Sequence, residues 1–546
     1  MIQGVTMQVE LDSGECLEIP VASDNRSLAD VLATHELPLN TRCGQRGLCR
    51  GCEVELRKGS LLTGAGTVHA QATVQACRAR LTDPATIKIP ARSRIEHRPQ
   101  VGETFEIAIP YAHDPLFQPV PGRRDTAFAV DVGTTTVVVL LVDLITGEVL
   151  SRAGSFNAQI RFGDNVITRI EAARKTENLA AMQCAIVMQT IQPLLLRACK
   201  RAGRPVNRIV GGAIAGNTAM LHLLMGEDPT PLGIAPFTPR FIKGRQVQAD
   251  DITLVADGLA WETPIQLLPG IAGYIGADIT AGIFASGMAF DPTPSLLVDI
   301  GTNGEIVLQN ASKLTACATA AGPAFEGCGL RCGTRAREGA VSDLRLLLHP
   351  FHLETETIGS VPLSRAIGLC GSAYLDFLAT ARSSGLIGVT GRFQAAAWES
   401  VPVQNRLIDD GGRALRLTEA DDSGALRISE VDVALLLQAK AAIGAGIEIL
   451  LETAGVRASD LGRVYLAGGF GMHLNVANAI AIGLLPGFRE EQIRVVGNTA
   501  LAGALLALVD RTTLDEMENL RDQVEVVELN LTDNFEDRYI EHLMLP

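Results

Sequence analysis

A strand that ends in Asp-x-Gly-Thr occurs twice in this chain of 546 residues and constrains the fold of most of it. The first copy spans 127–136 and contains Asp131, and the second spans 295–305 and contains Asp299. Each copy continues into a second strand-like run, a turn and a third strand-like run. A unit that recurs with the same internal order predicts a duplicated α/β domain.

Both repeated turns carry residue types that bind phosphate. Glycine lets the backbone approach an oxyanion, Thr and Asn offer donors, and the turn amides can face phosphate oxygens. An aspartate at the end of each strand can hold a hydrated Mg²⁺ from opposite sides, so we predict that Asp131 and Asp299 position this cation. The predicted phosphate-binding residues are Gly133, Thr134, Thr135, Gly301, Thr302, Asn303 and Gly304.

A third element, 461–471, is a strand-like run that ends in Gly-Gly-Phe-Gly and precedes a helical stretch at 475–482. Such a sequence is more often only a tight turn. After two Asp-x-Gly-Thr turns, however, it predicts a surface on which an adenosine moiety lies flat against the backbone. The predicted adenosine-binding residues are Gly468, Gly469 and Gly471.

Four cysteines near the N-terminus have the spacing of a metal-binding loop. Cys43, Cys49 and Cys52 form a C-x5-C-x2-C pattern, and Cys77 follows at a distance. The pattern is similar to that of plant-type [2Fe–2S] ferredoxins, although their first gap is usually four residues; a gap of five resembles adrenodoxin and putidaredoxin. A zinc site or unrelated thiols are the alternatives, but zinc prefers two paired C-x2-C knuckles. We predict that the four cysteines bind a [2Fe–2S] cluster.

The segments around the cysteine loop follow the order of a β-grasp ferredoxin domain. Alternating residues predict a hairpin over 5–21, a helix that begins after Ser27, and a strand over 52–56 that follows the loop. Cys16 lies on the second hairpin strand and is predicted to be an ordinary buried thiol. The following stretch, 91–123, is rich in proline and is predicted to be a semi-rigid linker.

Composition excludes several function classes. The net charge is −14 and basic residues are not clustered, which argues against nucleic-acid binding. The N-terminus lacks the basic and apolar regions of a signal peptide, and a cluster needs reduced thiols, so we expect a cytoplasmic protein. The most apolar window, 267–290, contains Asp278 and five glycines and is predicted to be buried α/β structure instead of a membrane span.

The two aspartate turns and the glycine turn resemble the phosphate-1, phosphate-2 and adenosine motifs of the actin, sugar kinase and Hsp70 ATPase superfamily. Together with the cysteine loop, the whole chain resembles the reductive activators of corrinoid proteins, and 216–220 and 321–327 fit the same resemblance. It implies a multidomain α/β fold. The expected parts are a β-grasp [2Fe–2S] ferredoxin domain at 1–90, a Pro-rich linker at 91–123, and duplicated RNase-H-like (actin/Hsp70-type) ATPase halves at 124–290 and 291–546.

The resemblance also implies a function. Such a protein uses ATP to reduce an inactive Co(II) corrinoid, on a partner protein of a methyltransferase system, to Co(I). The electron would come from a reductase or ferredoxin through the [2Fe–2S] cluster, and a homodimer is expected. Relatives with a C-terminal [4Fe–4S] cluster are excluded because no cysteine follows Cys370. The Asp-x-His-x-x-Gly motif of corrinoid binding does not occur, so the corrinoid should belong to the partner.

Further residues leave alternatives open. Glu305 and Glu326 are the carboxylates best placed by motif to position water at a γ-phosphate, although ordinary surface carboxylates are the more common case. Asn217 would line the nucleotide cleft or cap a helix. Lone cysteines are usually buried apolar groups, which is the preferred interpretation of Cys317, Cys328, Cys332 and Cys370. A zinc site at His349, His352 and Glu354 lacks further ligands.

Three other functions remain open at this stage. One is an activator like those of 2-hydroxyacyl-CoA dehydratases, which hold a [4Fe–4S] cluster between subunits. The second is a small-molecule kinase of the same superfamily in which the ferredoxin domain senses redox state. The third is an electron-carrier scaffold with a degenerate ATPase, but the presence of both aspartates and all three turns counts against it.

Overall fold

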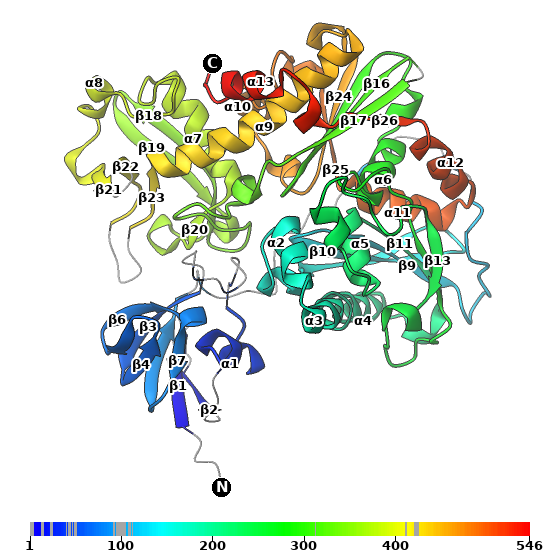
Figure 1. Ribbon diagram of the computed structural model, residues 1–546, viewed down its shortest axis with the longest axis horizontal. Coiled ribbons are helices and arrows are strands. Elements are labelled where there is room, and N and C mark those ends of the chain that lie inside the picture. The colour runs from blue at the N-terminus through cyan, green and yellow to red at the C-terminus, as the bar shows by residue number, and fades with distance from the viewer. Residues whose placement is uncertain are drawn as a thin grey trace. The chain divides into compact units, whose positions relative to one another are not determined.

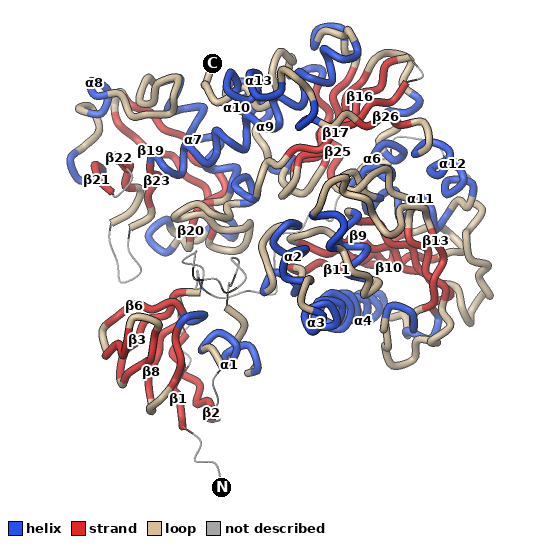
Figure 2. The backbone as a smooth tube through the Cα atoms, in the orientation of Figure 1, coloured by secondary structure: helices blue, strands red, loops and turns tan. Residues whose placement is uncertain are grey.

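The computed structural model describes most of the chain as two compact units (Figures 1 and 2). We call 1–97, with 159–164 and 420–424, the head unit, and we call 98–158, 165–419 and 425–546 the main unit. The residues described are 5–11, 16–21, 26–35, 37–39, 41, 45, 47, 52–90, 93, 105–107, 111, 113–311, 313–409, 412–419 and 425–546.

The head unit contains a mixed sheet of five strands in the order β2-β1-β8-β3-β6. β1 pairs antiparallel with β2, as the predicted hairpin requires, and parallel with β8. Helix α1 (Leu28–Thr34) begins where predicted, because the Ser27 hydroxyl accepts a hydrogen bond from the N–H of Asp30 at 3.1 Å. A smaller sheet has the order β5-β4-β7. The strands are β1 Val5–Leu11, β2 Cys16–Val21, β3 Glu53–Lys58, β4 Ser60–Thr63, β5 Gly66–His69, β6 Ala72–Gln75, β7 Ala79–Leu81 and β8 Ala85–Ile89.

Side-chain alternation decides which hairpin residues are buried. Met7 and Val9 on β1 face the core of the head unit and are fully buried, and Ile19 and Val21 on β2 are also buried. Successive side chains of a strand point to opposite faces. Cys16 lies on the outer face of β2 and is exposed. The prediction of a buried thiol at this position was therefore wrong.

Two six-stranded sheets form the frame of the main unit (Figure 2). Their orders are β11-β10-β9-β12-β14-β13 and β25-β24-β15-β16-β17-β26. In each sheet the three strands that come first in the chain, β9–β11 or β15–β17, form an antiparallel meander. Two later strands, β12 and β14 or β24 and β25, continue the sheet on the free side of β9 or β15 and run parallel to it. This shared order agrees with the duplicated unit predicted from the sequence. The strands are β9 Thr126–Val132, β10 Thr136–Asp143, β11 Val149–Phe156, β12 Ile209–Gly216, β13 Arg245–Gln248, β14 Pro264–Leu267, β15 Ser295–Ile300, β16 Gly304–Asn310, β17 Lys313–Thr319, β24 Arg463–Ala467, β25 Ile493–Gly497 and β26 Val524–Val526.

Helices cover these sheets, and a subdomain lies between β17 and β24 in the sequence (Figure 1). The first half contains α2 Val166–Ala173, α3 Thr176–Ile186, α4 Gln192–Ala202, α5 Thr218–Leu224 and α6 Ala277–Ala285. The second contains α7 Gly371–Ser383, α8 Ala395–Trp398, α9 Glu430–Ala454, α10 Val476–Ala481, α11 Thr499–Val509, α12 Thr512–Arg521 and α13 Phe535–His542. The subdomain strands are β18 Ala340–Leu348, β19 Phe351–Thr357, β20 Gly368–Leu369, β21 Arg406–Asp409, β22 Gly412–Arg416 and β23 Arg427–Ser429.

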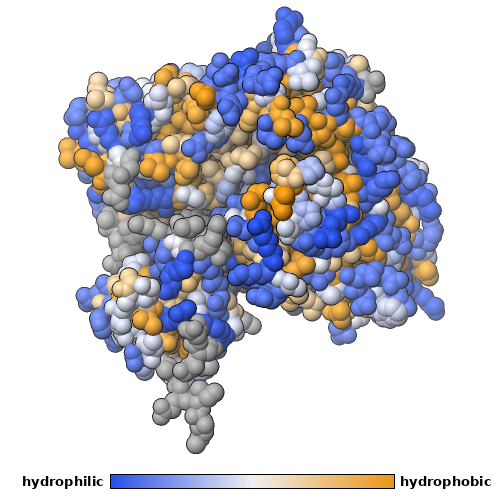
Figure 3. Space-filling model, viewed as in Figure 1, coloured by the Kyte–Doolittle hydropathy of each residue, from blue (hydrophilic) through white to orange (hydrophobic). Residues whose placement is uncertain are grey.

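The apolar window at 267–290 forms the end of β14 and the buried helix α6, as predicted. α6 packs against α11, and Gly503 permits this close approach because an added Cβ would lie 2.4 Å from the Cβ of Ala281. Two other helical segments, 176–202 and 430–454, are long and apolar enough to cross a membrane by length and composition alone. α9, the second of these, packs along β16 and β17, so its apolar surface covers a sheet. On the face drawn in Figure 3, hydrophobic groups are scattered among hydrophilic ones.

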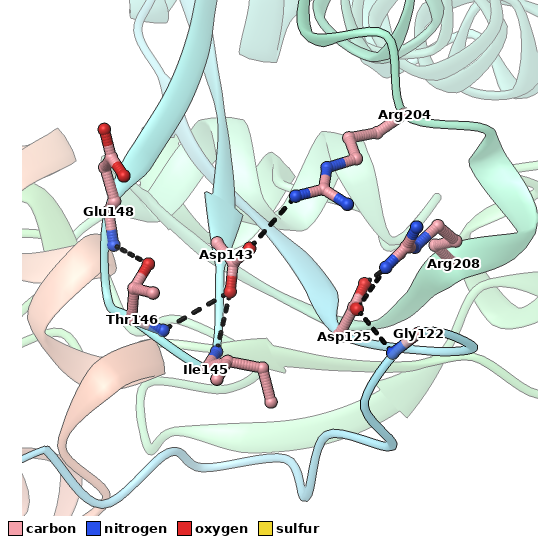
Figure 4. Close-up of polar contacts among 8 residues, drawn as sticks. All are labelled: Gly122, Asp125, Asp143, Ile145, Thr146, Glu148, Arg204 and Arg208. Atoms are coloured by element: carbon pink, nitrogen blue, oxygen red, sulfur yellow. Dashed lines mark hydrogen bonds and ion pairs between the residues drawn. The ribbon is translucent and has the colours of Figure 1, made fainter.

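Ion pairs fix the end of the first sheet that lies away from the Asp-x-Gly-Thr turn (Figure 4). Asp125, just before β9, accepts two hydrogen bonds from Arg208, just before β12, and one from the N–H of Gly122 at 3.1 Å. The Arg208 guanidinium holds the pKa of Asp125 below its usual range. Arg204 pairs with Asp143 at the end of β10 over 3.3 Å. These contacts join three neighbouring strands at their base.

The predicted linker is bound to the main unit where it is described. The N–H of Glu106 donates to the carbonyl of Val496 at 3.2 Å, and the N–H of Asp114 donates to the carbonyl of Val509 at 2.9 Å. The first contact is at β25 and the second is at the end of α11. These two contacts anchor part of the predicted semi-rigid linker to the main unit. We call its described residues 105–107 and 113–117 the strap.

Candidate functional site

A pocket in the main unit brings the three predicted turns together. Its lining comes from both six-stranded sheets, from the start of α6 and α11, and from the subdomain. Nearly all predicted nucleotide-site residues are in this lining. They are Asp131, Gly133, Thr134, Thr135, Asn217, Asp299, Gly301, Thr302, Asn303, Glu305, Glu326, Gly468 and Gly469.

Two predicted residues, Gly304 and Gly471, lie outside the lining. An added Cβ at Gly304 would lie 2.6 Å from the hydroxyl of Thr319 on the neighbouring strand. At Gly471 it would lie 3.1 Å from the side chain of Leu466. Both glycines therefore serve close packing inside the second half, and their contact with the nucleotide stays a prediction.

Glu326 joins the two aspartate turns. The Thr135 hydroxyl donates to one of its carboxylate oxygens at 2.5 Å, and the Thr302 hydroxyl donates to the other at 3.0 Å. The two hydroxyl oxygens lie 3.2 Å apart. One carboxylate thus bridges a turn from each half. Because phosphate also accepts hydrogen bonds from such hydroxyls, this bridge marks the place where a phosphate group would compete for the same donors.

The first turn is fixed from behind by its own half. The side-chain amide of Asn157 donates to the carbonyl of Gly133 at 3.0 Å. The guanidinium of Arg169, a fully buried side chain on α2, donates to the carbonyl of Thr134 at 2.5 Å. The side chain of Asn217 donates to the Thr134 hydroxyl at 2.9 Å. The turn is therefore positioned before any ligand arrives.

Asn217 caps a helix and also lines the pocket, so the structure does not separate the two alternatives left by the sequence; its contact with a nucleotide stays a prediction. Its side-chain oxygen accepts a hydrogen bond from the N–H of Met220 at 3.0 Å and so caps α5. Its amide nitrogen reaches the Thr134 hydroxyl in the pocket. Capping fixes the side-chain rotamer, and this fixes the position of the donor in the cleft.

The pocket holds a group of carboxyl groups in a buried environment. Burial raises the pKa of Asp131 to about 6, although a hydrogen bond from Asn498 at 2.8 Å opposes the shift. Burial and the neighbouring Asp131 raise the pKa of Asp299 to about 7. Burial, helped by Asp278 and Asp299, raises the pKa of Glu305 well above its usual range. A cation placed among such carboxyl groups would favour their charged forms.

Asp278 is a member of this group that the sequence did not predict as a site residue. It lies in the first turn of α6 and in the pocket lining, and burial followed by Asp299 and Asp131 raises its pKa to about 8. The sequence contained one signal for this role: Asp278 is the only charged residue in the apolar stretch 267–290. A buried helix that keeps one carboxyl group at its start points to a function for that group.

Asn498 and Thr499, at the start of α11, were also not predicted as site residues. Asn498 caps α11 by accepting a hydrogen bond from the N–H of Leu501 at 2.9 Å, and its amide donates to Asp131. Thr499 lines the pocket with a buried hydroxyl that lacks a hydrogen-bond partner among the described residues. An Asn-Thr pair before an apolar run is an N-cap signal, but it does not reveal what else the cap contacts.

The glycine turn also lines the pocket. Gly468 and Gly469 line it together with Phe470, whose ring stacks on that of Phe325 with 5.3 Å between centroids. Gly468 has a φ of 90°, and an added Cβ would lie 2.5 Å from a carboxylate oxygen of Asp299. This position therefore requires glycine, and it places the turn directly beside the carboxyl group.

In the head unit, two of the four predicted cluster cysteines are described. Cys52 and Cys77 are buried, and the N–H of Ala76 donates to the carbonyl of Cys52 at 3.0 Å, so the two cysteines lie on adjacent segments. Gly47, in the loop between the other cysteines, has a φ of 75° and packs against Arg78. Cys43 and Cys49 lie outside the described residues.

The remaining cysteines and histidines form no metal site where the structure describes them. Within the described ranges, no group of three or more His, Cys, Asp or Glu side chains has the arrangement of metal ligands. Cys317 is buried, and its thiol contacts the carbonyl of Gly446 at 3.8 Å. Burial raises the pKa of Cys370, which lines the pocket, to about 12. These thiols are held in their neutral, unreactive form.

Comparison with known proteins assigns the family. A family model described as the C-terminal domain of RACo, the ASKHA domain, matches residues 293–546, and one described as the RACo middle region matches residues 126–291. The chain belongs to the RACo family. The predicted resemblance to reductive activators of corrinoid proteins is confirmed, as is a multidomain α/β fold with an ATPase domain of the actin and sugar kinase type.

Individual relatives are similar to this RACo-family chain over most of its length. The corrinoid activation enzyme RamQ of Eubacterium limosum is 29% identical over 555 residues, which cover 90% of this chain and 92% of RamQ. The Co(II) methylated amine-specific corrinoid protein reductase of Methanosarcina barkeri is 26% identical over 412 residues, 71% of each chain. The solved structure of a reductive activator for corrinoid, iron-sulfur protein has a TM-score of 0.72 at 29% identity, covering 99% of this chain and 98% of that one.

Proposed function

We propose that this chain is an ATP-dependent reductive activator of a corrinoid protein. It would transfer an electron to the Co(II) form of a corrinoid bound to a partner protein of a methyltransferase system and so regenerate Co(I). The observation that carries the ATP-dependent part is the pocket in which Asp131, Asp299 and the two threonine turns converge. The names of the relatives supply the corrinoid target.

The proposed nucleotide site assigns a role to each part of the pocket. Asp131 and Asp299 would hold Mg²⁺ between the halves, and the cation would supply charge neutralisation of the phosphates. Thr135 and Thr302 would donate to phosphate oxygens that replace the carboxylate of Glu326. The glycine turn at Gly468 would accept the adenosine. Released from the threonines, Glu326 or the neighbouring Glu305 would orient the attacking water.

The head unit is proposed to be a β-grasp ferredoxin domain whose cluster is held by Cys43, Cys49, Cys52 and Cys77. The strand order β2-β1-β8-β3-β6 with a parallel central pair suits this assignment. Cys52 and Cys77 fit it as well, because they are buried on adjacent segments and could supply thiolates to one site. A [2Fe–2S] cluster bound there would supply a one-electron donor of low potential.

ATP is needed because reduction of Co(II) is unfavourable for a donor of that kind. Binding of nucleotide between the halves would close the cleft, and hydrolysis would reopen it. This cycle helps electron transfer only if the open and closed states bind the two redox states of the partner with different affinity. The bridge from Glu326 to Thr135 and Thr302 is the contact between halves that phosphate would replace.

The remaining assignments follow the same proposal. The electron donor would be a reductase or ferredoxin, the protein would act in the cytoplasm, and a homodimer is expected. Domain limits are proposed at 1–90, 124–290 and 291–546. The connecting segment at 91–123 is proposed to be a linker that is anchored through its strap.

The test is spectroscopic. Reduced protein is mixed anaerobically with a Co(II) corrinoid protein from the same organism, with and without Mg-ATP. We expect the absorption band of Co(I) only with ATP, and its loss in Asp131→Ala. ATP hydrolysis that responds to a small metabolite and not to corrinoid proteins would instead favour the kinase. The iron and sulfide content does not separate this protein from the activators of 2-hydroxyacyl-CoA dehydratases. Two chains with one [2Fe–2S] cluster each and two chains that share one [4Fe–4S] cluster both contain four irons and four sulfides. The EPR spectrum of the reduced cluster distinguishes the two cases.

A further inference from the structure

The charges that line the nucleotide pocket are strongly unbalanced. The lining contains five carboxyl groups, from Asp131, Asp278, Asp299, Glu305 and Glu326, and one basic side chain. ATP would add further negative charge. Mg²⁺ between the aspartates offsets part of it, but a terminal phosphate that extends past the cation needs a second positive partner. Within the described lining, Arg335 is the candidate for that partner.

Arg335 has buried donors for which the described residues supply no acceptor. It lies on the connection from β17 to β18, and its Nε and one terminal nitrogen are buried without a hydrogen-bond acceptor in the part of the chain that the structure describes. A guanidinium is always charged and carries N–H donors in a rigid fork. Burying such donors without an acceptor is unfavourable, and an oxyanion with two oxygens that accept parallel hydrogen bonds, such as a carboxylate or a phosphate, suits the fork.

The position of Arg335 places it beside the first phosphate turn. Its guanidinium carbon lies 5.4 Å from the centroid of the Phe156 ring, which belongs to the first half. Phe156 is the cross-strand partner of Thr136, the residue that follows the turn. Asn157, next in sequence, donates its N–H to the carbonyl of Thr135 at 2.8 Å. A cation from the second half is thus held over an aromatic ring at the edge of the first half's turn.

We propose that Arg335 binds the terminal phosphate of ATP and so distinguishes ATP from ADP. This inference rests on the proposed function of the pocket as an ATP site. Stacking on Phe156 would hold the guanidinium in place, and the phosphate would supply the acceptor that its buried donors lack. Because Arg335 and Thr135 come from different halves, an oxyanion bound by both would join the halves only while the terminal phosphate is present.

Binding of Mg-ATP and Mg-ADP to the full chain, measured by calorimetry, tests the proposal. We expect Arg335→Ala to weaken Mg-ATP binding roughly 10- to 100-fold, the range for loss of hydrogen bonds to a charged group. Mg-ADP affinity should change less than about threefold. Arg335→Lys keeps the charge but not the fork, so it should restore part of the ATP affinity. Arg345→Ala, an exposed arginine on β18 paired only loosely with Glu354, is the matched control and should leave both affinities unchanged.

Three outcomes would overturn the assignment. Unchanged ATP affinity in Arg335→Ala would show that the guanidinium does not reach the nucleotide. Equal weakening of ATP and ADP, in both the alanine and the lysine variant, would indicate a structural role or a contact with another part of the nucleotide. A wild-type chain that binds ATP distinguishes these failures from a failure of the proposed function. If wild type binds neither nucleotide, the ATP site itself is wrong, and the role of Arg335 falls with it.

Discussion

The two six-stranded sheets of the main unit share a strand order but hold their aspartate turns in different ways. In the first sheet, Asn157 and buried Arg169 bind carbonyls of the turn from behind, and Asn498 donates to Asp131. In the second sheet, the contacts described for the Thr302 hydroxyl are with Glu326 and Thr135, which face it across the pocket.

This difference has a physical consequence. A turn fixed by its own half is preorganised, and binding a phosphate there costs little ordering. A turn whose donors are satisfied by a carboxylate in the pocket must exchange that partner when phosphate arrives. Both turns share this requirement, because the Thr135 hydroxyl also donates to Glu326. They differ in their backbone contacts: Asn157 and the charged Arg169 hold the first turn, whereas the Thr319 hydroxyl donates to the carbonyl of Gly304 in the second. We therefore infer that the backbone of the first turn is the more fixed platform of the two.

The largest effect is expected at the aspartates. Asp131→Asn and Asp299→Asn should each reduce ATP turnover at least about a hundredfold, because loss of a cation ligand removes several kcal/mol of charge stabilisation. If the halves contribute equally to the cation site, the two losses will be similar. ATPase assays over a range of Mg²⁺ measure this, and Asp522→Asn, an exposed surface change, is the control. Full activity in either variant would contradict a shared site.

Removal of Arg169 tests the fixed platform. Arg169→Met should lower the free energy of unfolding by roughly 2–4 kcal/mol, because the carbonyl of Thr134 loses a buried charged donor. It should also weaken nucleotide binding. Chemical denaturation and calorimetry measure the two effects. Arg174→Met, at the exposed end of the same helix, should change neither. Undiminished nucleotide affinity in a destabilised Arg169→Met protein would show that the platform is not needed for binding.

Asn498→Ala should reduce the difference in pKa between Asp131 and Asp299. The variant removes the hydrogen bond that opposes the raised pKa of Asp131, so the pKa should rise above about 6 towards that of Asp299. Loss of the cap should also reduce stability by about 1 kcal/mol. The pH at which Mg²⁺ binding is half-maximal should therefore shift upward. An unchanged pH midpoint, with the expected loss of stability, would limit Asn498 to its capping role.

The smallest effect is expected from Asp278. Its pKa is raised to about 8, so the folded state holds the proton more tightly than the unfolded state does. Stability from this group is complete below about pH 4 and is lost as the pH rises towards 8. Without Mg²⁺, the Tm of the wild type should therefore fall between pH 5 and 8. In Asp278→Asn this fall should be smaller by roughly 1–4 °C. Asp257→Asn, on an exposed loop, should leave the profile unchanged.

Short-range sequence patterns predicted the strands and turns well. The strands that end at Asp131 and Asp299 are runs of apolar residues followed by Gly and Thr, and both occur where expected. The helix cap at Ser27 was recognised for the same reason, since its signal lies within three residues. The family resemblance rested on these local motifs and was confirmed by the comparisons.

Contacts between distant segments were beyond the sequence. Asp278, Asn498 and Arg335 reach the pocket from three separate elements, and each has a local pattern that an ordinary helix or loop would share. Gly304 shows that a glycine in a motif can have a second reason. It belongs to a phosphate-type motif, but the hydroxyl of Thr319 on the adjacent strand explains why glycine is needed. Motifs identify which segments meet; they do not specify which side chains face the space between them.

The strap limits where the chain can be truncated at its N-terminal side. β25 is the outer strand of its sheet, and the strap covers part of its free edge through Glu106 and through a bridge between Phe105 and Gly497. A chain that begins at residue 126, where the family match begins, would lack this cover. Uncovered strand edges pair with other molecules and promote aggregation. Truncations that start after residue 105 should therefore aggregate more readily than those that keep the strap.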